Sequence, residues 1–484
     1  MRLLLIAALF ACHPGARAQL PEPVAALMAK SGIAPDELGL LVLRGDGVVL
    51  AHGAERPMHP ASTIKVLTTL VGLEQLGPVF RGRTELRSAA PVVGDTLMGD
   101  LVVRGGADPD FSGEALAGML QSLRNQGIAR IKGRLVFDRQ LFNPPRLDLG
   151  APPFDEYPEA YYNVIPDALM VNKNMLQLDM RSGADQVRVT MVPALEGVSV
   201  ESRFTLIEGA CAKWEDGWKL PEVLREAGGK LKVVLRGTFP KHCASSNNIN
   251  IVDRHDYLDR LLRLAWGRLG GTIDGPTVDG AGPPEARLLA EHSARALPEL
   301  VRDINKISDN TLARLLYLSL GSLEADRVDG SRPTPPVPGA NTQTTLVRAD
   351  QAVRAWLRGH GIDDAGLVLE NGSGLSRLER ISARQLGGVL QAGLRSIWAP
   401  EYMASLPIVA MDGTMRRRLP DSPAAWRARL KSGSVNNVVA VAGYVPDMAG
   451  QQHVVVAMVN SPNAGRGRGG AVLDALVDWV ARRK

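Results

Sequence analysis

The feature that most constrains the fold is a change of texture between about residues 84 and 279, where short strands and turns interrupt a chain with stronger helical patterns on both sides. Runs such as LVVRGG, QVRVTMVP and KLKVVLRGTF are separated by turn residues, which is typical of β-structure. A chain of 484 residues is also too long for one compact core. The sequence therefore predicts an α/β (α+β) protein in which a large β-rich insertion splits another domain.

The segments on either side of this stretch have clear patterns of their own. Residues 38–53 predict a hairpin, because two apolar strands flank Gly45-Asp46-Gly47. The run TIKVLTTLVGLEQLG, directly after Ser62, has apolar residues at three- and four-residue spacing and predicts a buried helix. Near the end, VVAVAGYVP and QHVVVAMVN predict adjacent buried strands, and AVLDALVDWVARR predicts a final helix packed against them.

The first 18 residues have the pattern of a cleaved export signal. Arg2 supplies the positive start, residues 3–12 are apolar, and Ala16-Arg17-Ala18 fits the small-x-small rule for cleavage before Gln19. The apolar run is too short to span a bilayer, and no second stretch of spanning length follows. We therefore expect a soluble periplasmic protein without a transmembrane segment. The alternative is a lipoprotein that carries its lipid on Cys12.

Charge and cysteine content narrow the partners further. The net charge is +5 without long Lys/Arg runs, so nucleic acid is not an expected partner. Cys211 and Cys243 remain after signal removal, and two cysteines in an oxidising compartment usually pair. We expect this disulfide, with two buried free thiols as the alternative. The scattered histidines and the lack of His-Glu-x-x-His or Cys-x-x-Cys motifs predict no metal site.

Three short motifs carry catalytic chemistry: Ser62-Thr63-Ile64-Lys65 (Ser-x-x-Lys), Ser308-Asp309-Asn310 (Ser-x-Asn) and Lys431-Ser432-Gly433 (Lys-Ser/Thr-Gly). Each alone has an ordinary structural explanation, such as a helix cap, a surface lysine or a turn. Their combination in this order, each in a suitable local setting, is far more specific.

These residue types suit acyl transfer. Residues three apart on a helix share a face, so Lys65 can approach Ser62. A serine hydroxyl needs a neighbour that takes its proton, and lysine can do so if burial or a second cation, here Lys431, lowers its pKa. Ser308 can relay a proton to a leaving amine, and Asn310 offers an amide to a substrate carbonyl.

The third motif is suited to holding a peptide. Lys431-Ser432-Gly433-Ser434 precedes VNNVVAVAGYV, so it lies on or beside a strand whose edge can pair with an extended substrate. Gly433 allows close approach, and the Ser432 hydroxyl can hold a carboxylate. The backbone N–H groups of Ser62 and Ser434 are candidate oxyanion donors.

With these motifs the chain resembles the low-molecular-mass class C penicillin-binding proteins, the D-alanyl-D-alanine carboxypeptidase/endopeptidase family. The 246 positions between Ser62 and Ser308 fit the large insertion that this family carries there. Other stretches are similar to the family as well: DLVVRGGADP (100–109), GRLVFD (133–138), NGSGLSR (371–377), SLPIVAMDGTMRRRL (405–419) and KSGSVNNVVAVAGYV (431–445).

The resemblance implies a serine-transpeptidase/β-lactamase-like domain, an antiparallel sheet flanked by helices. Residues 19–83 and 285–484 would form it, and residues 84–284 would be the insertion, with two subdomains. Ser62 would be the acylated nucleophile and Lys65 its base, and the other positions follow by motif: Ser308, Asn310 and Lys431 as catalytic residues, and Ser432, Gly433 and Ser434 as substrate-binding residues. Ser432 stands where threonine is commoner in the family, but the hydroxyl is kept.

The predicted function is a serine DD-peptidase that works through an acyl-enzyme on Ser62. It would act on peptidoglycan stem peptides, releasing terminal D-alanine, cleaving D-alanyl cross-links, or both, with no cofactor. β-Lactam antibiotics would be covalent inhibitors. The alternatives are a β-lactamase or esterase on the same scaffold, and a non-catalytic wall-binding protein. The Pro-rich segment 332–339, RPTPPVPG, predicts an exposed loop without an assigned role.

Overall fold

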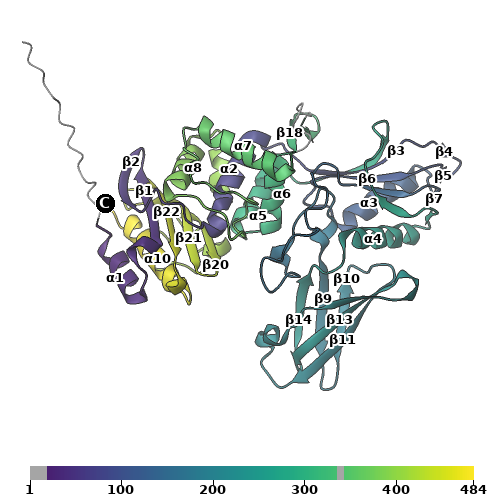
Figure 1. Cartoon of the computed structure of the whole chain (residues 1–484), viewed down its shortest axis with the longest axis horizontal. Coiled ribbons are helices and arrows are strands. Elements are labelled where there is room, and N and C mark those ends of the chain that lie inside the picture. Colours follow the sequence, from purple (N-terminus) through teal and green to yellow (C-terminus); the bar gives the residue numbers. More distant parts are fainter. Residues whose placement is uncertain (1–18, 335–342) are drawn as a thin grey trace, which may run out of the picture.

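The computed structural model describes residues 19–334 and 343–484. One part of the molecule is built on a five-stranded antiparallel sheet with the order β2-β1-β22-β21-β20 (Figure 1). Its strands are β1 (Leu38–Arg44), β2 (Gly47–His52), β20 (Arg429–Val435), β21 (Val438–Pro446) and β22 (Gln452–Asn460). The predicted hairpin and the adjacent closing strands are confirmed, and β1 pairs with β22 although they come from opposite ends of the chain.

Both faces of this sheet are buried along its central strands, because successive side chains point to opposite faces and nearly all of them are apolar. In β1, Leu40 and Val42 pack on one face, whereas Leu41 and Leu43 pack on the other. The first face is covered by α1 (Glu22–Ser31) and α10 (Arg468–Ala481). The apolar stripe of α10 is buried against the sheet, which confirms the predicted packing of the final helix.

The second face carries the helices that surround the three motifs. They are α2 (Lys65–Leu76), α5 (Leu297–Lys306), α6 (Asn310–Leu320), α7 (Thr345–Gly359), α8 (Ala383–Arg395) and α9 (Ala399–Ser405). Helix α2 is buried along nearly its whole length, which confirms the prediction for the run after Ser62. A two-stranded hairpin, β18 (Leu323–Asp326) and β19 (Gly330–Pro333), follows α6.

Two predicted segments fall wholly or partly outside the described residues: the export signal with Cys12, and most of the Pro-rich segment 332–339. The prediction of a loop is wrong for the first residues of the Pro-rich segment. Arg332 and Pro333 belong to strand β19, where Arg332 pairs with Glu324 and Pro333 with Leu323. A proline is tolerated there because it ends a short edge strand.

The chain leaves the helices through β3 (Arg83–Ser88) and returns through β17 (Arg287–Ser293), which pair with each other. They belong to a sheet with the order β16-β8-β6-β3-β17, completed by β6 (Leu101–Gly106), β8 (Leu135–Asp138) and β16 (Thr277–Asp279). Beside it lie α3 (Gly113–Asn125), α4 (Arg254–Arg268) and a small sheet of β4 (Val92–Val93), β5 (Thr96–Leu97), β7 (Arg130–Ile131) and β15 (Thr272–Ile273) (Figure 1).

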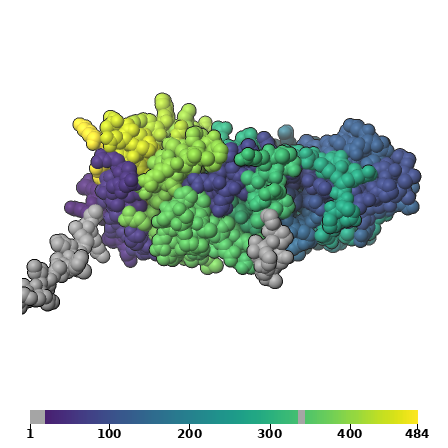
Figure 2. Space-filling model, turned by 90° about the horizontal axis from the view of Figure 1, so that it is seen from above, coloured from purple at the N-terminus to yellow at the C-terminus, as the bar shows by residue number. Residues whose placement is uncertain are grey.

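Two three-stranded sheets complete the β-rich part. One has the order β10-β9-β14, with β9 (Leu176–Ser182), β10 (Val187–Val192) and β14 (Ala244–Ile249). The other has the order β11-β13-β12, with β11 (Val198–Ile207), β12 (Glu222–Arg225) and β13 (Leu231–Pro240). In Figure 2 the purple start of the described residues and the yellow end of the sequence lie together at one end of the molecule, and blue-to-teal segments lie at the other. Across the described ranges, no helix is long and apolar enough to cross a membrane.

Candidate active site

Ser62 lies in a single 3-10 turn, Ala61–Ile64, that runs directly into α2 at Lys65. Ala61 has a φ of 45°, a left-handed conformation that costs energy for any residue with a side chain. Lys65 has no exposed surface. The turn thus presents Ser62 at the head of a buried helix, three residues before a buried amine.

Three acceptors surround the amine of Lys65. Its Nζ lies 3.0 Å from Ser62 Oγ, 2.7 Å from Asn310 Oδ1 and 2.5 Å from the carbonyl oxygen of Ser373. An ammonium group can donate to all three. A neutral amine can donate only to Asn310 and Ser373, and its lone pair then faces Ser62 Oγ, where it can accept the hydroxyl proton.

The protonation state of Lys65 follows from its surroundings. Burial lowers the pKa of Lys65 from 10.5 to about 7, because the ammonium form loses its water. The negative charges of Glu379 and Asp309 act against this, and the positive charge of Arg314 adds to it. Near neutral pH a large fraction of Lys65 is therefore the free amine.

A second buried lysine lies across the site. Lys431 Nζ donates to Ser308 Oγ at 2.9 Å and to the carbonyl oxygen of Ser432 at 2.7 Å. Burial, and then the positive charge of Lys65, hold the pKa of Lys431 well below its ordinary value. Ser308 has a φ of 63°, a left-handed conformation that aims its side chain from the loop before α6. Each serine hydroxyl is thus paired with one buried amine.

The second motif also contacts the β-rich part of the chain. Asp309 caps α6 by accepting from Leu312 N at 2.9 Å, and it forms an ion pair of 2.6 Å with Lys173. Asn310 accepts from Lys65 and donates through Nδ2 to the carbonyl oxygen of Tyr162 at 3.2 Å. Tyr162 and Lys173 lie between β8 and β9, so two segments far from the motifs help to fix them.

The third motif forms the edge strand β20. A Cβ atom at Gly433 would lie 2.8 Å from Ser62 N, so only glycine lets this strand approach the nucleophile turn so closely. The hydroxyl of Ser432 donates to Thr414 Oγ1 at 2.7 Å. Thr414 belongs to a short turn, Gly413–Met415, which places two hydroxyls side by side at this end of the strand.

A cleft of about 970 Å³ is lined by residues of the first two motifs and by the end of β20 from Ser434, whereas Ser432 and Gly433 do not line it. Ser62, Ser308, Asn310 and Ser434 line it, whereas Lys65 and Lys431 contact them from the interior. The other wall comes from the segment between β8 and β9, with Phe154, Asp155, Tyr157, Tyr161 and Tyr162. Arg377 also lines the cleft, and its guanidinium lies 4.7 Å from the centre of the Phe154 ring. Among the described residues, no three His, Cys, Asp or Glu side chains gather as a metal site.

Motif reasoning missed four residues of this site. Ser373 and Thr414 lie in NGSGLSR and SLPIVAMDGTMRRRL, segments singled out only by their similarity to a family, without a role. Tyr162 and Lys173 contact Asn310 and Asp309 across more than a hundred positions of sequence. No local pattern reveals such long-range contacts.

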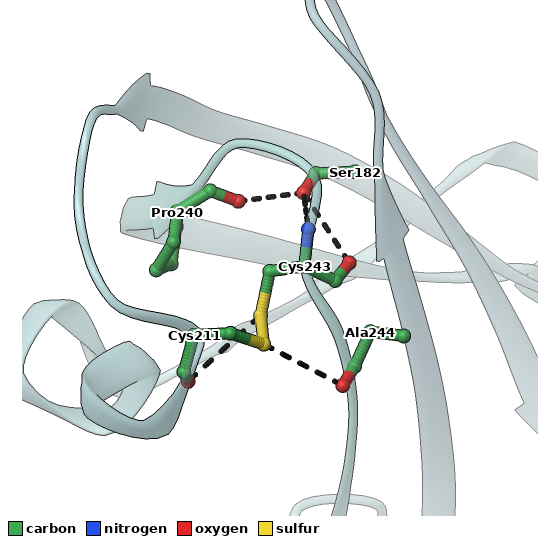
Figure 3. The surroundings of a disulfide bond; sticks show 5 residues. All are labelled: Ser182, Cys211, Pro240, Cys243 and Ala244. Carbon is green, nitrogen blue, oxygen red and sulfur yellow. Dashed lines mark hydrogen bonds between the residues drawn. A yellow bond between two sulfur atoms is a disulfide. The ribbon is translucent and has the colours of Figure 1, made fainter.

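Cys211 and Cys243 form a disulfide that ties the turn Cys211–Gly217 to the start of β14 (Figure 3). Cys243 N donates to Ser182 Oγ at 2.9 Å, and Ser182 Oγ donates to the carbonyl oxygen of Pro240 at 2.6 Å. The same turn leads to Trp218, whose indole donates to the buried carboxylate of Glu159 at 3.0 Å. The disulfide thereby supports the segment that forms one wall of the cleft.

Known proteins share this fold over most of the chain. The crystal structure of penicillin binding protein 4 from Haemophilus influenzae has a TM-score of 0.75 at 21% identity, covering 95% of this chain and 99% of that one. The same protein has been solved in complex with a β-lactam, with a TM-score of 0.73 at 21% identity over the same shares. This likeness confirms the predicted fold class.

Curated relatives also match along most of their length. A D-alanyl-D-alanine carboxypeptidase of Actinomadura sp. (strain R39) is 28% identical over 471 residues, which covers 93% of this chain and 82% of the relative. The D-alanyl-D-alanine carboxypeptidase DacB of Haemophilus influenzae is 26% identical over 423 residues, which covers 86% and 84%.

The family itself is identified by a family model rather than by any single relative. The model described as the D-Ala-D-Ala carboxypeptidase 3 (S13) family matches residues 20–483, a span that contains all three motifs. This match confirms the predicted family and the predicted enzyme class, a serine-type D-Ala-D-Ala carboxypeptidase. The chain belongs to the D-Ala-D-Ala carboxypeptidase 3 (S13) family.

Proposed function

We propose that Ser62 is the nucleophile of this DD-peptidase, that Lys65 is its general base, and that the substrates are peptidoglycan stem peptides. The observation that carries the proposal is the 3.0 Å contact between Lys65 Nζ and Ser62 Oγ at the cleft, made by an amine whose pKa burial lowers to about 7. A base with a pKa near the working pH combines a useful free fraction with useful proton affinity.

Acylation would begin with the formation of a tetrahedral intermediate. Ser62 Oγ attacks the carbonyl carbon of the penultimate D-alanine, and its proton passes to the lone pair of Lys65. The developing oxyanion would accept hydrogen bonds from the backbone N–H groups of Ser62 and Ser434. The close approach of β20 to the turn that carries Ser62 supports this role, since a Cβ atom at Gly433 would lie only 2.8 Å from Ser62 N.

Collapse of this intermediate breaks the bond between the carbonyl carbon and the nitrogen of the terminal D-alanine, and that leaving amine must receive a proton. Lys431 lies 2.9 Å from Ser308 Oγ, so Ser308 can pass a proton to the amine and be reprotonated from Lys431. Water then attacks the acyl carbon and supplies the proton that restores the Ser62 hydroxyl, and the proton held by Lys65 replaces the one that Lys431 gave up. Both lysines are buried, so the surrounding water competes little for these protons.

Substrate would lie along β20 as an added strand, since that strand is the edge of the sheet. Its terminal carboxylate would be held by the hydroxyls of Ser432 and Thr414, which lie 2.7 Å apart. Asn310 would contact a backbone carbonyl of the substrate. Ser432 keeps the hydroxyl that these contacts need.

The inhibitors and the location of the protein follow from the same assignment. β-Lactams would acylate Ser62, in keeping with the complex of the Haemophilus influenzae protein. Residues 1–18 would direct export to the periplasm.

Residues 19–83 and 285–484 would form the catalytic domain and 84–284 an insertion. The pairing of β3 with β17 supports these limits, because the chain leaves and returns side by side.

The test uses the purified mature protein and two defined muropeptides, an uncross-linked pentapeptide and a cross-linked dimer. We expect loss of D-alanine from the first, cleavage of the second, or both, read by mass spectrometry. Ser62→Ala should abolish every product. Cleavage that survives in folded Ser62→Ala protein would contradict the assignment of the nucleophile.

A further inference from the structure

Glu379 is a carboxylate with no exposed surface, and the steps above do not use it. It lies between α7 and α8, and its Oε1 accepts the N–H groups of Gly372 at 2.9 Å, Asn371 at 3.1 Å and Glu370 at 3.4 Å. Hydrogen bonds from several backbone donors to one carboxylate are strong and directional. Glu379 therefore fixes the backbone of the turn that follows residue 369.

That turn touches the nucleophile element at several points. The carbonyl oxygen of Gly372 accepts from Thr68 Oγ1 at 2.7 Å, and that of Ser373 accepts from Lys65 Nζ at 2.5 Å. A Cβ on Gly374, which has a φ of 84°, would lie 2.0 Å from the carbonyl oxygen of Ala61. The ring of His59 bridges the same two segments, with Nε2 2.6 Å from the carbonyl oxygen of Ser376 and Nδ1 accepting from Ala61 N at 3.0 Å.

The electrostatic situation of Lys65 points to the same residue. Four charged groups face its amine from the surrounding elements: Glu379, Asp309, Arg314 and Lys431. Glu379 has the largest influence that raises the pKa of Lys65. The charge of Asp309 is shared with Lys173 in an ion pair of 2.6 Å.

The charged groups that face Glu379 itself are Lys65 and Arg314. Burial raises the pKa of Glu379, while its backbone hydrogen bonds and the charge of Lys65 oppose that rise. Within the described residues, its second oxygen, Oε2, has no hydrogen-bond partner. The Glu379 carboxylate is thus held through Oε1 alone. It acts on the Lys65 amine through its negative charge and through the turn that it fixes.

We propose that Glu379 is the positioning residue of the acylation step: it fixes the turn whose Ser373 carbonyl holds Lys65 against Ser62, and its negative charge stabilises Lys65 after that amine has taken the Ser62 proton. The inference rests on the proposed roles of Ser62 and Lys65. Glu379 acts through Lys65 and does not touch the substrate.

Two variants separate its two effects. Glu379→Gln keeps an oxygen for the three N–H groups but removes the charge, whereas Glu379→Ala removes both. The readout is the rate of Ser62 acylation by a β-lactam from pH 5 to 9, followed by mass spectrometry, with circular dichroism and a urea titration to establish folding. Glu74→Gln is the matched control. Glu74 lies on α2, the helix that begins with Lys65, about 13 Å from Lys65 along the helix axis.

In the wild type the rate should fall as the pH drops below about 7, because protonated Lys65 cannot accept a proton. In Glu379→Gln this fall should move to lower pH by about one unit, because the ammonium form has lost a neighbouring opposite charge. The plateau should decrease by at most about tenfold. Glu379→Ala should lose about 10²-fold at every pH, because the turn is no longer fixed. Glu74→Gln should leave the midpoint unchanged.

A folded Glu379→Gln protein whose midpoint equals that of the wild type would overturn the proposal. An equal shift in Glu74→Gln would overturn it too, because any lost charge would then suffice. If the wild type itself is not acylated at Ser62, the proposed function fails first and this inference with it.

Discussion

Helix α2 and strand β20 each bring one fully buried lysine to the same cleft, and the two amines differ in their neighbours. Lys65 faces the carboxylates of Glu379 and Asp309, which offset part of the cost of burial. For Lys431, burial and the positive charge of Lys65 both act to lower the pKa. Burial therefore affects the two amines differently. The carboxylates beside Lys65 raise its pKa toward neutral pH, so that it can take the Ser62 proton, whereas the lowered pKa of Lys431 lets it give up its proton to Ser308 more readily.

Replacing Lys65 by methionine should have the largest effect of any change to this pair. Methionine fills similar space without an amine, so the fold should survive while the proton acceptor of Ser62 is lost. We expect acylation by a β-lactam to slow by about 10³-fold. The measurement is the time course of the protein–β-lactam adduct by mass spectrometry. A rate within tenfold of the wild type would contradict the assignment of Lys65 as base.

The matching change on β20, Lys431→Met, should have a smaller effect. It removes the proton source for Ser308 but leaves Ser62 and Lys65 in contact, so we expect D-alanine release from a pentapeptide to fall by about 10²-fold. The comparison is made on the same substrate preparation, with Lys65→Met alongside. An equal or larger loss in Lys431→Met would reverse the roles given to the two amines.

The stability of the protein should depend on pH in a way that reports the buried amines. Lys65 titrates near 10.5 when unfolded and near 7 when folded, so the unfolded chain binds more protons between these values. The free energy of unfolding should therefore rise from pH 7 toward pH 10, by at most about 1.4 kcal/mol per pH unit for this group. Below pH 7 this contribution levels off.

Urea titrations of the wild type and Lys65→Met at pH 7, 8 and 9 measure this rise. The wild type should gain stability relative to the variant at each step, because methionine has no proton to lose. Curves that stay parallel across the three pH values would mean that Lys65 is not held as a neutral amine.

The smallest expected effect concerns Lys173, the cation that shares the charge of Asp309. In Lys173→Met the field of Asp309 acts on Lys65 without a neighbouring cation, so the pKa of Lys65 should rise and the acid limb of acylation should move to higher pH. Because Lys173 is 36% exposed, we expect a shift of less than about half a unit. A shift to lower pH would contradict this account of the site's charges.

Sequence patterns predicted the parts of the fold that repeat locally. The near-continuous apolar runs of β1, β21 and β22 and the apolar stripes of α2 and α10 belong to side chains that face two buried layers. The three motifs were found because their order and spacing are specific. The spacing of three residues predicted that Lys65 can approach Ser62, and Lys65 Nζ lies 3.0 Å from Ser62 Oγ.

Local patterns could not predict the rest of the site. The left-handed conformations of Ala61 and Ser308 are not the preference of either residue type, and both residues contact segments distant in sequence, Ala61 at Gly374 and Ser308 at Lys431. Glu379 and the turn that it fixes lie more than three hundred positions from Lys65 in the sequence. Such contacts depend on tertiary structure, so single-sequence reasoning does not reveal them. The end of β19 at Arg332 and Pro333 was missed because its own composition does not indicate a strand. It forms one by pairing with β18, the preceding arm of the hairpin.

The central claim is that Lys65 is a neutral amine near physiological pH, and its titration tests this directly. Lysine labelled at the ε-carbon would be followed by NMR from pH 5 to 11, and the Lys65 resonance assigned by its absence in Lys65→Met. We predict a midpoint near 7, far below that of the exposed lysines. A midpoint close to 10.5 would show that the amine stays charged, and Lys65 could not then be the base that activates Ser62.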